Sequence, residues 1–144
     1  MPTVTRWFIK AGLIYFLMGV ALAFAAELPF INSGALLLPV YWHMLVMGWL
    51  TQIIIGVSIW MFPRKWRDKN KRESVLTWLT FWLLNSGLIL RFLTEPFLPI
   101  FYDTFSIQLI IITSAILQIS AICTYIAEIW PRVQSRKKKR GVSA

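Results

Sequence analysis

Four long apolar runs dominate this chain and restrict it to the membrane. Each holds about 20 mostly uncharged residues, the length that an α-helix needs to cross the hydrocarbon core of a bilayer. We predict membrane-spanning helices at residues 7–26, 39–62, 75–93 and 105–130. Because 58% of the 144 residues are hydrophobic and only 15% are charged, no soluble core of this size could bury so much apolar surface.

The predicted fold class is an all-α membrane protein, a four-transmembrane-helix bundle. Lipid gives backbone groups no hydrogen-bond partners, so a spanning segment has to satisfy its own, as a helix does. We assign residues 1–131 to this bundle, and residues 132–144 to a basic tail that lies against anionic lipid headgroups. Pro39 and Pro131 are expected to mark the start of the second helix and the end of the fourth.

The cations predict the orientation of the bundle. They fill the segment between the second and third runs and the tail, at Arg64, Lys65, Arg67, Lys69, Lys71, Arg72, Arg132, Arg136, Lys137, Lys138, Lys139 and Arg140. Residues 27–38 and 95–104 hold no Lys or Arg. The positive-inside rule therefore predicts that both termini are cytoplasmic. Since the charge of +9 lies in these two blocks and not along one amphipathic face, the pattern argues against a nucleic-acid partner.

His43 is the only histidine, and it lies about one turn inside the outer end of the second predicted helix. An ionisable side chain at this depth is a functional hypothesis by default, and a neutral imidazole bonded to a neighbouring helix is the alternative. At about 100° per residue, Met47, Leu50 and Ile54 share the face of His43. The opposite face carries a small or polar residue at every fourth position, at Gly48, Gln52 and Gly56. We expect this second face to pack within the bundle or against a second chain.

Arg91 is a cation near the outer end of the third helix, where the positive-inside rule predicts none. Glu95 follows one helical turn later, so an i,i+4 ion pair is expected to compensate it. A guanidinium has five donors, and Arg91 could hold Glu95 and still present a fork to another carboxylate at the depth of His43. The sequence leaves both roles open.

The fourth helix carries a polar stripe that we expect to form interhelical hydrogen bonds, at Thr113, Ser120, Thr124 and Glu128. Cys123 is the only cysteine, so the chain can build neither a disulfide nor a cysteine-based zinc site. No Gly-rich phosphate loop, carboxylate dyad or Ser/His/Asp set is evident, which argues against a hydrolase or a nucleotide-driven protein. A small transporter or channel is disfavoured because no charge lies at the middle of a run.

Residues 38–49, LPVYWHMLVMGW, followed by Gly56 and the exit WMFPR, resemble the second helix of haem-copper oxidase catalytic subunits. The segment is most similar to the C-family oxidases and nitric oxide reductases. In that family a histidine just inside the outer surface binds the low-spin b-type haem. By resemblance, His43 is expected to be an axial ligand of haem iron. Residues 87–91, with Glu95 and Pro96, resemble the family more loosely, so about half of the chain takes part.

The chain also departs from this family. The catalytic subunits have about a dozen helices, a second histidine for the same haem, and further histidines for copper and the second haem. With one histidine, no haem-copper active site can exist here. Two copies of His43 could bind one iron across a homodimer whose two-fold axis lies along the membrane normal. Met47, Leu50 and Ile54 would then pack against the haem, and Arg91 would pair with its propionates.

The resemblance therefore implies a homodimeric b-type cytochrome of the bacterial inner membrane, which transfers electrons through haem b. Electron transfer is expected rather than catalysis, with a quinol pool or a respiratory complex as partner. The alternative is a cofactor-free accessory or assembly subunit of a respiratory oxidase complex, in which His43 is hydrogen-bonded and not ligated.

Overall fold

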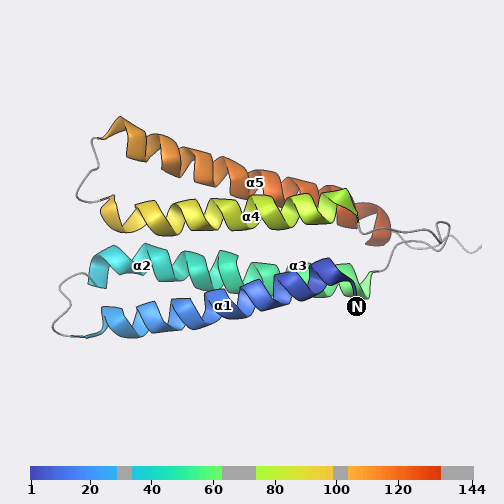
Figure 1. Ribbon diagram of the computed structural model, residues 1–144, viewed down its shortest axis with the longest axis horizontal. Helices are drawn as coiled ribbons and strands as arrows, with labels where there is room; N and C mark the ends of the chain where they lie inside the picture. Colours follow the sequence, from blue (N-terminus) through green and yellow to red (C-terminus); the bar gives the residue numbers. More distant parts are fainter. Residues whose placement is uncertain (29–33, 63–73, 99–103, 134–144) are drawn as a thin grey trace, which may run out of the picture.

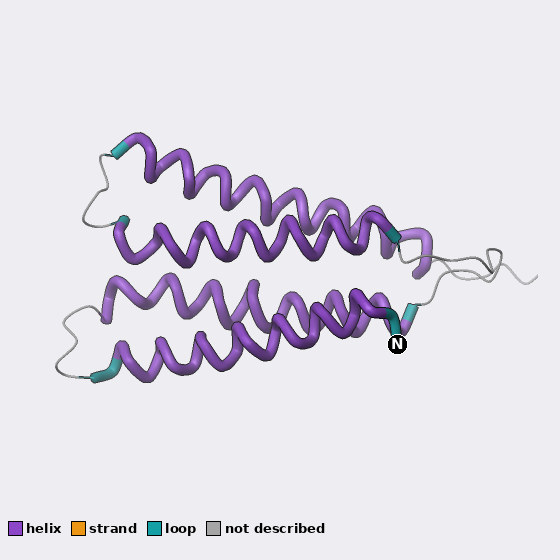
Figure 2. The backbone as a smooth tube through the Cα atoms, in the orientation of Figure 1, coloured by secondary structure: helices purple, strands orange, loops and turns teal. Residues whose placement is uncertain are grey.

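The computed structural model describes residues 1–28, 34–62, 74–98 and 104–133, which form helices and short turns (Figure 1). Four helices are long and apolar enough to cross a membrane, and they span Thr3–Ala26, Leu37–Met61, Val75–Phe97 and Phe105–Val133. Figure 2 shows only helix and loop along the described backbone. The prediction of an all-α, multi-pass membrane protein with four spans is therefore confirmed. Most of the Lys and Arg residues from which the orientation was predicted lie outside the described residues.

The first and fourth spans are continuous α-helices, α1 (Thr3–Ala26) and α5 (Phe105–Val133). The second span, as we call it, joins three segments: α2 (Gly34–His43), the π-helical η1 (Met44–Leu50) and α3 (Thr51–Met61). The third consists of α4 (Val75–Thr94) and the 3-10 turn η2 (Glu95–Phe97).

Two predicted helix boundaries were wrong, and both were placed at prolines. Pro39 lies inside α2, which begins at Gly34, and Pro131 lies inside α5, which continues to Val133. A proline removes one backbone hydrogen bond to the carbonyl four residues earlier. Both prolines lie near a helix end, so the loss is small there, and membrane helices tolerate proline more readily than soluble ones.

The spans pair as two antiparallel hairpins, α1 with the second span and α4 with α5 (Figure 1). The start of α1 and the end of α5 lie at the same end of the bundle. We call this the terminal end and the opposite one the far end. If the predicted orientation holds, the terminal end faces the cytoplasm.

Glycines let the helices of each hairpin approach closely. A Cβ atom added at Gly48 would lie 2.7 Å from Cγ of Tyr15 in α1, and one at Gly87 would lie 2.9 Å from Cγ of Gln118 in α5. A Cβ atom added at Gly56 would lie 3.0 Å from Cβ of Phe8 in α1. The expected packing of the Gly48 and Gly56 face within the bundle is therefore confirmed.

The closely packed apolar core lies toward the terminal end, where the two hairpins meet. Its buried side chains are Val4, Phe8, Ile55, Ile59, Phe81, Leu84, Leu88 and Ala121. The rings of Phe8 and Phe81 meet edge to face with centroids 5.1 Å apart. This contact joins α1 of one hairpin to α4 of the other.

Polar contacts join the hairpins at successive depths from the far end to the terminal end. They are His43 to Glu95, Gln52 to Asn85, Ser58 to Tyr125, and Arg132 to the backbone oxygen of Phe62. Lipid tails are as apolar as the helix surfaces, so the hydrophobic effect does not drive helices together within the membrane. Side-chain hydrogen bonds and close packing stabilise their association instead. The large apolar side chains that cover the outside of the bundle, such as Leu17 at 71% exposed and Ile119 at 64%, face that lipid.

Candidate functional site

The candidate site lies at the far end of the bundle, where the second span changes its helical form. His43 is the last residue of α2, and the next seven residues, Met44–Leu50, form the π-helical segment η1. The backbone N–H of Thr51 donates to Val46 five residues earlier, which is π-helical spacing. Such π segments are rare, and they are frequent at functional sites.

The imidazole of His43 is oriented by the backbone of its own helix. Its Nδ1 lies 2.8 Å from the carbonyl oxygen of Pro39, one turn earlier. A carbonyl oxygen can only accept, so Nδ1 carries the hydrogen. In the neutral ring, Nε2 then holds a lone pair, which is the form that binds a metal.

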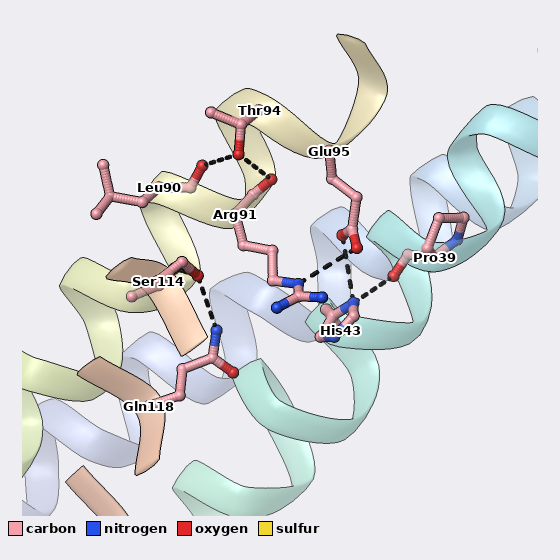
Figure 3. Close-up of polar contacts among 9 residues, drawn as sticks. Pro39, His43, Leu90, Arg91, Thr94, Glu95, Ser114 and Gln118 are labelled. Atoms are coloured by element: carbon pink, nitrogen blue, oxygen red, sulfur yellow. Dashed lines mark hydrogen bonds and ion pairs between the residues drawn. The ribbon is translucent and has the colours of Figure 1, made fainter. Parts of the chain in front are cut away.

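Glu95 extends from the start of η2 toward both His43 and Arg91 (Figure 3). Its Oε1 accepts a hydrogen bond from Nε of Arg91 at 3.3 Å, and its Oε2 lies 3.2 Å from Nδ1 of His43. The Glu95 side chain is only 8% exposed. The predicted i,i+4 pair of Arg91 with Glu95 is therefore confirmed, and the contact of Glu95 with His43 is a finding that the sequence did not predict.

The contact between Glu95 and His43 is electrostatic more than a hydrogen bond. Nδ1 has one hydrogen, and that hydrogen is directed at Pro39 at the shorter distance. Oε2 of Glu95 consequently has no hydrogen-bond donor among the described residues.

A cavity of about 330 Å³ opens between the second span and the α4–α5 hairpin on the side of Arg91. It is lined by Met47, Arg91, Ala115, Gln118, Ile119, Ile122 and Cys123. Two of the residues expected to bind a cofactor, Met47 and Arg91, thus line the same cavity. Leu50 does not line this cavity and is 47% exposed on the outside of the bundle, as is Ile54 at 53%.

A second cavity, of about 260 Å³, lies on the other side of the line where the hairpins meet. Its walls are apolar apart from Tyr15 and Asn85. Both cavities are lined by residues of η1 and of α4.

Within the described ranges, no group of three or more His, Cys, Asp or Glu side chains could hold a metal ion. A metal bound by His43 would therefore need a ligand from outside the described residues or a cofactor that brings its own. In comparisons with protein-family models, with curated proteins and with solved structures, no match to this chain was found.

Proposed function

We propose that this chain is a membrane b-type cytochrome in which His43 is an axial ligand of a low-spin haem. The observation that carries the proposal is the hydrogen bond from Nδ1 of His43 to Pro39, which leaves the Nε2 lone pair for a metal. The resemblance of residues 38–49 to a haem-binding helix supports the same role. In a single-histidine chain this ring is the one imidazole that iron could use.

The surroundings of His43 suit such a ligand. Its side chain is 31% exposed, so a flat group outside the bundle could reach the ring. Arg91 uses Nε for Glu95, and its two terminal nitrogens have no hydrogen bond to the rest of the described chain. One of those nitrogens would hold a haem propionate, which leaves the other for a second ligand. Met47 and Leu50 of the following turns would supply apolar contact.

A homodimer supplies the second axial ligand. A two-fold axis along the membrane normal would place both copies of His43 at equal depth, on either side of one iron. The second span has large exposed apolar side chains beside His43, with Trp42 at 53% and Val46 at 43% exposed. This surface would form the contact between the two copies.

Haem bound in this way supplies one-electron transfer, and the chain would act as an electron carrier and not as a catalyst. The positive-inside pattern favours cytoplasmic termini, and the resemblance favours the bacterial inner membrane. His43 would then lie near the periplasmic surface, at the end of the bundle where its redox partner docks.

The ratio of haem to protein in the purified chain tests this arrangement. We expect one haem per two chains in a dimer, measured by pyridine haemochrome assay and by light scattering in detergent. His43→Ala should lower the haem content to near zero, and Thr113→Val, on the exposed side of α5, should retain it. A colourless protein that co-purifies with an oxidase at fixed stoichiometry would instead support the accessory-subunit alternative.

A further inference from the structure

The cavity between the second span and α5 contains a polar group whose orientation is fixed by neighbouring hydrogen bonds. Oγ of Ser114 donates to the carbonyl oxygen of Gly87 at 2.8 Å, and that bond uses its only hydrogen. Ser114 must therefore accept from Gln118, whose Nε2 lies 3.2 Å away. The amide of Gln118 can be assigned one way only, with Nε2 toward Ser114.

This assignment leaves the amide oxygen of Gln118 without a partner in the described chain. The side chain is 7% exposed, and it lines the cavity together with Arg91. Figure 3 shows the oxygen directed away from Ser114. The cavity thus offers an unpaired acceptor on α5 and unpaired guanidinium donors on α4, with apolar walls from Ile119 and Ile122.

A ligand for this cavity has to be neutral and membrane-soluble. Gln118 contacts Gly87, which is twelve residues after Val75 and so about 18 Å along α4 at a rise of about 1.5 Å per residue. That depth is well inside a hydrocarbon core of about 30 Å, where an ionised headgroup is strongly disfavoured. Glu95 already compensates the charge of Arg91, and the Gln118 oxygen would repel an anion.

We propose that this cavity, between Met47, Arg91 and Gln118, binds the head ring of a membrane quinone or its hydroquinone. A ring carbonyl would accept from Arg91, and a hydroquinone hydroxyl would donate to the Gln118 oxygen. A volume of about 330 Å³ is at the small end of ligand pockets, as suits a single ring whose isoprenoid tail stays in lipid. A quinone bound here could exchange electrons with the haem, and this redox role rests on the proposed cytochrome function. Binding of the quinone itself does not require haem.

Cys123 provides the test, because it lines the same cavity and is the only cysteine of the chain. The full chain in lipid nanodiscs is treated with methyl methanethiosulfonate, and modification is followed by mass spectrometry. The probe is decylubiquinol, kept reduced under argon, because its hydroxyl can donate to the Gln118 oxygen and its fully substituted ring does not add thiols. At roughly ten times its dissociation constant about nine-tenths of sites are filled, so modification should slow about tenfold.

Two variants in the cavity should weaken or abolish this protection. Gln118→Leu removes the acceptor and should raise the half-protecting concentration about tenfold, the effect of one lost hydrogen bond. Ile122→Trp fills the cavity and leaves the bond to Ser114 in place, so it tests the site even if Gln118→Leu fails to fold. Thr113→Val, on the exposed side of α5, is the matched control and should protect Cys123 like the parent.

Three results would overturn the quinone site: no protection of the parent, full protection in Ile122→Trp, or equal protection by laurate, an anionic amphiphile. The measurement is made on protein with and without haem. Protection in haem-free protein would uphold the cavity even if the cytochrome proposal failed. A haem spectrum without protection would remove the cavity and leave the cytochrome.

Discussion

Glu95 places its two carboxylate oxygens between cationic and imidazole groups of different hairpins, with Oε1 3.3 Å from Nε of Arg91 and Oε2 3.2 Å from Nδ1 of His43. This contact joins the far ends of the two hairpins. It also explains how a cation is accommodated at a membrane depth that normally excludes one. The ring of His43 is held between this carboxylate and the Pro39 oxygen.

We predict that Glu95→Ala destabilises the bundle more than removal of both Arg91 and Glu95 does. The single change leaves Arg91 uncompensated at 22% exposure, and we expect a loss of roughly 2–3 kcal/mol. The double variant Arg91→Leu with Glu95→Leu should lose less, because no charge is left unpaired. Unfolding in mixed micelles titrated with SDS measures both, and a double variant that is weaker than the single would contradict the ion-pair account.

Replacing Asn85 should destabilise the bundle more than replacing its hydrogen-bond partner Gln52. Asn85 accepts from Nε2 of Gln52 at 3.2 Å and donates from its own Nδ2 to the carbonyl oxygen of Phe81. Oε1 of Gln52 is buried and has no partner in the described part of the chain. Asn85→Leu leaves the whole Gln52 amide unpaired, so we expect it to destabilise by about 1 kcal/mol more than Gln52→Leu. The double-mutant cycle should give a coupling of about 0.6 kcal/mol, up to roughly 1.7. Equal single effects would show that the pair is not bonded in this way.

Gly48 should not accept a methyl group. A Cβ there would lie 2.8 Å from Cβ of Tyr15, which cannot move without a shift of α1. We expect Gly48→Ala to destabilise by about 1–3 kcal/mol. Gly12→Ala is the matched control, because its Cβ would meet Cδ1 of Ile53, the end of a flexible side chain, at 3.2 Å. Comparable melting temperatures for the two variants would argue against the close α1–second span contact.

The orientation can be measured with fusions to the C-terminus. Cytoplasmic termini predict that fused green fluorescent protein fluoresces and that fused alkaline phosphatase is inactive. The reverse pattern would place His43 near the cytoplasmic surface instead. It would also show that the cations at residues 64–72 and 132–140 do not determine the topology.

Hydropathy and local spacing predicted much of this fold and part of the site. The four spans follow from run length alone, and the Arg91–Glu95 pair follows because i,i+4 residues are neighbours on any helix. Pro39 and Pro131 misplaced two boundaries, because proline ends a soluble helix more strictly than one in lipid. The contact of Glu95 with His43 could not be predicted, since it depends on how the two hairpins face each other.

The polar stripe of α5 shows that residue type alone does not predict which polar side chains bond to a neighbouring helix. Thr124 bonds Thr80 of α4 and Glu128 accepts from Ser74, as interhelical contacts were expected to do. Thr113, however, is exposed and donates only to its own helix. The buried position is instead the adjacent Ser114, and the close approach of Gly87 selects it. The π-helical segment η1 was likewise not predicted, because no local signal in Met44–Leu50 specifies it.

The reduced-minus-oxidised absorption spectrum of the purified chain tests the central claim most directly. The account predicts a Soret band that shifts on reduction, with sharp bands of a low-spin b-type haem, and the loss of these bands in His43→Ala. Met44→Leu, at the neighbouring residue, should keep them. A parent protein with no such bands, or a His43→Ala variant with an unchanged spectrum, would contradict the assignment of His43 as the iron ligand.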